Sequence, residues 1–166
     1  MAYHITDQLL GAQPIADTST TKNHALGTVV RAVDSTYGGG EFIYLLGVAS
    51  TVVGSLVYYN ATTYQTVLEP GSTDSTGVPL AVAMSANVAS QYGWYQISGN
   101  AVVKKQAVTV EPQVSVFVSA TAGRITDVSS AGEQIIGARS ANLTTVTSTT
   151  STVVVTINRP LRTGIA

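Results

Sequence analysis

Short runs of β-branched and aromatic residues, separated by glycine, proline, asparagine and serine, fill the chain from residue 26 onward. Runs of this length and composition are typical of β-strands. No long window repeats apolar residues at the i, i+3, i+4 and i+7 positions of an amphipathic helix, so we predict little helix. The sequence therefore predicts an all-β domain. Its strands are expected at 27–33, 41–46, 55–59, 80–85, 94–98, 107–110, 114–119, 134–140 and 151–157.

The segments between the expected strands are rich in turn residues. Residues 38–40, 69–77 and 129–132 consist largely of Gly, Ser, Thr, Asp and Pro, and we expect turns there. Residues 143–157 alternate Thr and Val around the sequence STTS, which predicts a hairpin with exposed hydroxyls and buried valines. Pro160 cannot donate to a ladder, so we expect the last strand to end there.

Three short segments of the chain each have a similar segment later in the sequence, and the later segments follow one another in the same order as the earlier ones. Their order favours a duplicated β-unit over coincidence, although the offset between the copies drifts. Two similar halves, each with an apolar face, would bury these faces together as a single small β-sandwich or barrel, a β-tulip-like barrel included. The matches are FIYLLGVA (42–49) with WYQISGNA (94–101), YYNAT (58–62) with FVSAT (117–121), and AMSANV (83–88) with ARSANL (138–143).

The first 25 residues differ from the rest of the chain. They lack a sustained period of 2 or 3.6 and contain Pro14 and a hydroxyl-rich run. We interpret residues 1–25 as an N-terminal arm that stays extended until it meets a partner. The predicted organisation is this arm, a β-domain at 26–160 and a C-terminal tail at 161–166.

The charge and hydrophobicity of the chain limit the kinds of molecule that it can bind. Charged residues make up only 10% of the chain, so hydroxyls must cover much of the surface, which suits a protein packed against others. A net charge of −1 gives no basic footprint for nucleic acid. The one basic doublet, Lys104-Lys105, is typical of a solvated turn or strand edge. No apolar run approaches the ~18 residues of a membrane-spanning helix. We expect neither a nucleic-acid nor a membrane partner.

No arrangement of residues predicts catalysis. His4 and His24 both lie in the predicted arm and have no metal-ligand spacing, and the acids are scattered beside turns. Nucleophile-elbow, P-loop and Rossmann motifs are absent from the sequence. We therefore expect no enzyme and no catalytic, cofactor-binding or metal-binding residue, while a facing pair of carboxylates stays open as an alternative.

The aromatic residues Tyr92, Trp94 and Tyr95 are close together in the sequence. In a strand, Tyr92 and Trp94 face one side and Tyr95 the other, so at least one of them belongs to a core. The others could stack on a ligand or contact a partner.

Residues 38–51 (GGGEFIYLLGVAST), residues 77–101 (GVPLAVAMSANVASQYGWYQISGNA) and the later GARSA at 137–141 resemble the decoration, or cement, proteins of tailed-bacteriophage capsids. The resemblance covers roughly residues 26–143. It implies a β-rich protein, often trimeric, that sits on the outside of the capsid and grips its subunits with a terminal segment. The Thr-rich segment at 143–157 departs from the simplest members.

On this resemblance we expect a non-enzymatic viral structural protein that cements neighbouring subunits of the major capsid protein. It would be a homotrimer, made in the cytoplasm of the bacterial host and located on the outer capsid surface of the virion. The alternative is a phage fibre or receptor- and glycan-binding module using Trp94. Deleting residues 1–25 is expected to abolish capsid binding and leave the fold intact. The expected capsid or subunit contacts are Tyr3, Ile5, Leu9, Leu10, Pro14, Ile15 and Trp94.

Overall fold

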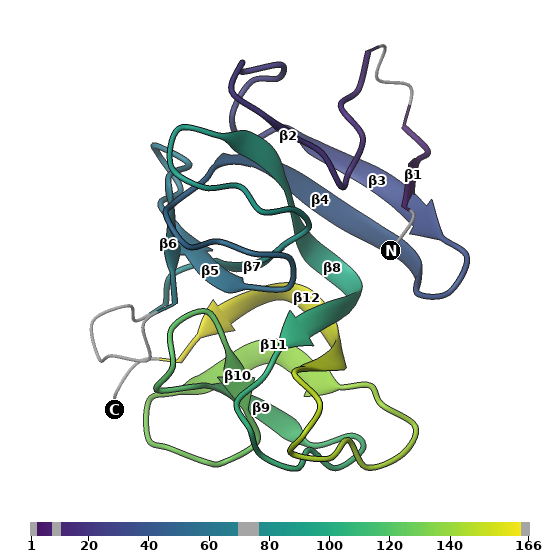
Figure 1. Cartoon of the computed structure of the whole chain (residues 1–166), viewed down its shortest axis with the longest axis vertical. Helices are drawn as coiled ribbons and strands as arrows, with labels where there is room; N and C mark the ends of the chain where they lie inside the picture. The colour runs from purple at the N-terminus through teal and green to yellow at the C-terminus, as the bar shows by residue number, and fades with distance from the viewer. Residues whose placement is uncertain (1–2, 8–10, 70–76, 164–166) are drawn as a thin grey trace.

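The computed structural model describes residues 3–7, 11–69 and 77–163, and its regular elements in these ranges are all β-strands. They form one antiparallel sheet that is not closed and that folds into an upper and a lower half, which confirms the all-β prediction (Figure 1). None of the described segments is a helix able to cross a membrane. The strands are β1 (His4–Ile5), β2 (Thr18–Ser19), β3 (Val29–Asp34), β4 (Gly38–Leu46), β5 (Leu56–Tyr59), β6 (Thr66–Leu68), β7 (Leu80–Ala83), β8 (Tyr92–Lys104), β9 (Ser115–Val118), β10 (Ile125–Thr126), β11 (Gln134–Ser140) and β12 (Thr152–Arg162).

Strand β8 is shared by the two halves and runs from one to the other (Figure 1). Its first part pairs with β4, from Tyr92 to Gly99, and its last part pairs with β12, from Ser98 to Lys104. The partners change over at Gly99, whose φ is +98°. A Cβ atom here would collide with the carbonyl oxygen of Gly39, so the crossover requires glycine.

The two halves have the same strand topology. In the first half the pairing order is β4, β8, β7, β5 and β6, and a parallel bridge between Leu46 and Gln65 connects the last strand back toward β4. In the second half the order is β8, β12, β11, β9 and β10, and a parallel bridge between Lys105 and Ile125 leads back to the end of β8. The two-half organisation predicted from the sequence is therefore present at the level of topology.

The sequence matches agree only partly with this duplication. YYNAT and FVSAT lie on the equivalent strands β5 and β9, and the SAN matches follow β7 and end β11. FIYLLGVA and WYQISGNA do not correspond, because the topology equates β4 with the last part of β8 rather than its first part. The first match was therefore misaligned, although it pointed to the correct strands.

Each half encloses an apolar core, and a third cluster covers the outside of the first half. Alternation along β4 places Ile43 and Leu45 inside the first half, while Phe42 and Tyr44 face outward. The core of the second half includes Ala101, Val103, Val116, Val118, Ile125, Ile135, Val153, Val155 and Ile157. The outer cluster includes Tyr3, Ile15, Val30, Ala32, Phe42, Tyr44, Met84 and Trp94.

An expected turn and an expected strand are wrong. Residues 38–40 belong to β4 rather than to a turn, and the turn lies at residues 35–37. There the Asp34 carboxylate accepts the backbone N–H groups of Thr36 and Tyr37 and so holds the hairpin. Residues 107–110 do not form a strand, since only Val110 makes a bridge, and its partner is Val146.

The last strand is longer than predicted and continues through Pro160. Arg159 has a φ of +45° and Gly137, across the ladder, a φ of +76°. The register shifts between Ile136 and Ala138, so this irregularity takes the proline out of the regular hydrogen-bond pattern. β12 therefore includes Leu161 and Arg162, which the sequence assigned to the tail, and residues 164–166 lie outside the described residues.

Candidate functional site

The described residues of the N-terminal segment, 3–7 and 11–25, pack against the first half, and we call them the strap. β1 pairs with β3 through His4 and Val33, and β2 pairs with β8. Tyr3 and Ile15 are buried against the outward aromatic face of β4 and β8, and Tyr3 meets the Phe42 ring edge-on at 4.8 Å. Burial of these apolar side chains stabilises the packed state, so in the described residues the strap is not a free arm.

Gln13 fixes the strap to the sheet through its backbone. Its N–H donates to Nε2 of His24 at 3.0 Å, and its carbonyl oxygen accepts a hydrogen bond from the indole N–H of Trp94 at 2.8 Å. The His24 ring also lies against the Tyr44 and Trp94 rings, with centroids 5.0 and 5.4 Å away. The two histidines predicted in an exposed arm therefore differ, because His4 is exposed and His24 is half-buried.

The Gln13 side chain extends this attachment. Its amide oxygen accepts hydrogen bonds from Tyr44 Oη and Asn23 Nδ2, at 3.0 and 2.9 Å. Its amide nitrogen donates to the carbonyl oxygens of Asp17, at 2.8 Å, and of Tyr92. Gln13 is only 6% exposed, so these partners satisfy a buried amide that water cannot reach.

The expected contact residues fall into three groups. Tyr3, Ile15 and Trp94 are buried within this chain, so in this conformation they cannot touch a partner. Ile5 is half-buried and Pro14 is exposed, which leaves both available at the surface. The other two, Leu9 and Leu10, lie outside the described residues.

The aromatic residues of β8 are also internal. Trp94 is fully buried beneath the strap, and Tyr95 lies inside the first half, where burial raises its pKa to about 12. Tyr92 stays half-buried beside Tyr44. These positions remove the surface platform that a stacking site for sugars would need.

A buried ion-pair group joins the two halves. Arg162, near the end of β12, donates to Glu69 at 2.6 Å and to Glu133 at 2.8 Å. Glu69 follows β6 in the first half, whereas Glu133 precedes β11 in the second. The group of Arg162, Glu69 and Glu133 is buried, and its charges pair with one another. This arrangement indicates a structural connection between the two halves.

Lys105, predicted to be solvated, is completely buried. Its ammonium group donates to the carbonyl oxygens of Val108, at 2.6 Å, and Gln106, at 3.3 Å. Burial lowers its pKa, and the negative charge of Asp127 acts in the opposite direction. Lys105 thus stabilises the loop after β8 by donating hydrogen bonds to the backbone carbonyl groups of that loop.

The described residues do not bring a set of metal-ligating side chains together. Groups of three or more His, Cys, Asp or Glu that could hold a metal are absent among them. The buried acids Glu69 and Glu133 both pair with Arg162.

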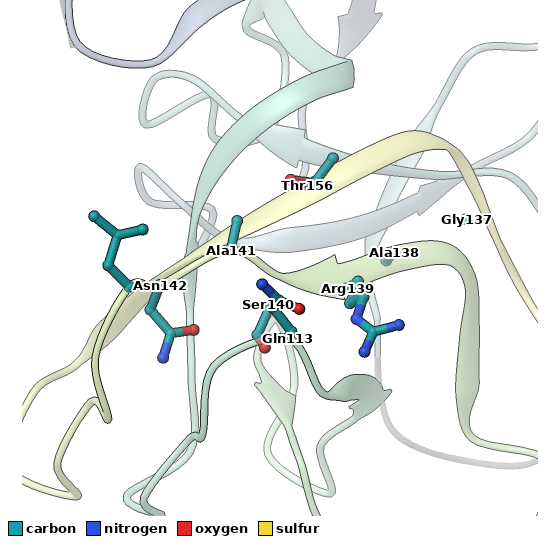
Figure 2. Close-up of a pocket in the computed structure, with 9 residues that line it drawn as sticks. Gln113, Gly137, Ala138, Arg139, Ser140, Ala141, Asn142 and Thr156 are labelled. Carbon is teal, nitrogen blue, oxygen red and sulfur yellow. The ribbon is translucent and has the colours of Figure 1, made fainter.

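A hollow of about 780 Å³ lies on the outer side of the second half, along β11 (Figure 2). Thr156 of β12 forms one wall, Gln113 another, and Leu143 lies in the segment that follows β11. An adjoining hollow of about 340 Å³ shares Asn142 and is lined by Tyr37, Val102, Val146 and Val154, among others. We call the two hollows together the outer groove.

Two side chains give the outer groove its chemistry. Leu143 is 96% exposed, more than any other large hydrophobic residue of the described surface. Arg139 projects from β11 at the surface (Figure 2). In the described ranges no carboxylate lies within ion-pair distance of its guanidinium group. The groove therefore offers an unpaired cation on one side, an exposed apolar side chain next to Asn142 on the other, and several hydroxyl and amide groups.

No family model, no curated protein and no solved structure matches this chain.

The groove residues were missed as a site by sequence reasoning, although a signal was present. The repeated motif ARSANL contains Arg139, Asn142 and Leu143, and its first copy AMSANV has methionine in place of the arginine. A charged residue in only one copy of a structural repeat indicates a role that belongs to that copy. Whether Arg139 is exposed depends on which half the strap covers, and the sequence pattern does not reveal which half that is.

Proposed function

We propose that this chain is a non-enzymatic structural protein that binds the outer surface of a bacteriophage capsid and cements neighbouring subunits of the major capsid protein. The observation that carries the proposal is the exposed outer groove, whose lining includes the solvent-exposed aliphatic side chain of Leu143 and the guanidinium group of Arg139. Exposed apolar surface bordered by polar groups is typical of protein interaction sites. The sequence resemblance to capsid decoration proteins supplies the identity of the partner.

Cementing would act by adding binding free energy between shell subunits. A molecule that contacts two neighbours must be detached from one of them before they separate. The strap is already packed on its own sheet, so its ordering would cost no further conformational entropy at docking. This differs from the expected arm, which would have to order on the capsid.

We also propose the homotrimer, because three linked copies would bind a three-fold lattice position with avidity. Apolar residues that could join copies are exposed on β3 at Val29 and Val33, on the sheet face opposite to the strap, and at the paired positions Ile136 and Leu161. Light scattering of the purified chain after size exclusion tests this. A native mass of three chains is expected, and a monomer would contradict it.

The fibre or glycan-binding alternative is weakened by the position of its main residue. It needed Trp94 at the surface, whereas Trp94 is fully buried and its indole N–H is already bonded to Gln13. No other observation on the described surface favours a sugar as ligand. Following the resemblance to decoration proteins, we propose that the protein is made in the host cytoplasm and is located on the outer surface of the virion.

Co-sedimentation tests the proposed function. Empty shells are assembled from the major capsid protein encoded by the same genome, mixed with the purified chain and pelleted. We expect saturable binding and shells that withstand higher temperature than bare ones. A chain that stays in the supernatant at all concentrations would contradict the proposal.

A further inference from the structure

We propose that the outer groove is a docking site for an extended segment of another protein chain, one that brings a carboxylate to Arg139 and an aliphatic side chain to Leu143. The inference rests on the proposed function and deepens it, because it names the surface used and the chemistry of the partner segment. It follows from comparing the same face of the sheet in the two halves.

In the first half, the outer face of the sheet is covered by an extended segment. Phe42 of β4 and Trp94 of β8 point outward, away from the core that contains Ile43 and Tyr95. The strap lies on them, and its Thr18 pairs with Gly93 at the start of β8. The duplicated fold thus shows which kind of occupant this face accepts, namely a chain segment rather than a helix.

In the second half, the strands equivalent to β4 and β8 are the last part of β8 and β12. Val102 and Val154 point outward there, opposite to the core residues Val103 and Val155. Tyr37 and the segment at 145–150 border this face in place of a strap, and together with Val102 and Val154 they line the smaller hollow of the outer groove. The face is in the strap position, but loop residues border it and leave two hollows there.

The groove differs in chemistry from the face that the strap covers, and this identifies the occupant. The strap meets an aromatic surface, whereas the groove presents Val102, Val154 and Leu143 together with the guanidinium group of Arg139. A carboxylate can form two parallel hydrogen bonds with this guanidinium group. Aliphatic side chains next to the carboxylate would then cover the apolar part of the groove.

The test uses a library of random dodecapeptides displayed on yeast as the probe. Peptides are sorted for binding to the folded full chain and then measured against Arg139→Glu and Leu143→Asp. We expect selected peptides to combine Asp or Glu with Leu, Ile or Val, and to bind at least about tenfold more weakly to either variant. Lys22→Glu and Val128→Asp make the same changes at exposed positions outside the groove and should leave binding unchanged.

Several outcomes would overturn the inference. Peptides without acids, or peptides whose affinity ignores Arg139 and Leu143, would show that the groove is not the preferred docking surface. Self-association of the chain that Leu143→Asp abolishes would assign the groove to a second copy. Unfolding cannot explain the expected losses if both variants retain the melting temperature of the natural chain, as their exposed positions predict.

Shell binding separates this inference from the proposed function. If Arg139→Glu abolishes co-sedimentation with shells and Lys22→Glu does not, both are supported. If Arg139→Glu still binds shells fully, the docking site is wrong and the proposed function stands. If the natural chain fails to bind shells, the proposed function is contradicted even where the peptides behave as expected.

Discussion

Gln13 contributes to stability far more than an average glutamine, because it is buried and bonded at both its backbone and its side chain. The Gln13→Ala variant leaves the buried Tyr44 hydroxyl without its acceptor and removes the amide from the Asp17 and Tyr92 carbonyl groups. We expect a loss of about 2 kcal/mol in the free energy of unfolding, measured by urea denaturation. Gln134→Ala, at an exposed glutamine, is the control and should change it by less than about 0.5 kcal/mol.

Tyr95 should make the protein sensitive to alkali. Burial raises its pKa in the folded chain to about 12, whereas the unfolded chain releases the proton near the ordinary value of 10.0. Between these values the unfolded state gains by ionising and the folded state does not, so the free energy of unfolding falls as the pH rises. Unfolding curves measured from pH 9 to about 12 should show this fall. The fall should be smaller in Tyr95→Phe, and an equal fall in that variant would exclude Tyr95 as its cause.

At the scale of elements, the strap is needed by the first half. Deleting residues 1–25 would expose Phe42, Tyr44 and Trp94 to water. We expect a loss of at least about 3 kcal/mol in the free energy of unfolding. Since Trp94 is the single tryptophan, its fluorescence should shift to the red, and a hydrophobic dye should bind. A truncated chain with unchanged emission and stability would show that the strap is an arm after all.

Most strands could be predicted from the sequence, because the β-branched runs between Gly and Pro residues are distinctive. β6, β10 and the strap strands were missed, since they are two or three residues long and pair through tertiary contacts. The run at 107–110 looks like a strand, but the Lys105 ammonium group closes it into a loop. Burial of Trp94 could not be predicted, because it depends on which half the strap covers.

At the scale of the whole molecule, Arg162 connects the two halves through Glu69 and Glu133. Replacing it as Arg162→Met leaves these buried carboxylates without the guanidinium group, and we expect a loss of about 3–5 kcal/mol. Thermal unfolding should then show separate transitions for the two halves. Arg139→Met, at an exposed arginine, is the matched control and should melt like the natural chain. Equal melting of both variants would contradict a connecting role for Arg162.

The duplication explains how one fold can present two different surfaces. Both halves have the same strand topology and share β8, yet one outer face is covered by the chain's own strap and the other is open. A molecule built in this way can use one half for stability and the other for binding. The open face thus becomes the side expected to meet a capsid.

Cryo-electron microscopy of shells incubated with the purified chain tests this account most directly. We predict added density on the outer shell surface, repeated at equivalent lattice positions, with the outer groove of the second half against a capsid subunit and the strap still on the first half. Shells without added density, or density in which Arg139 and Leu143 face solvent, would contradict it.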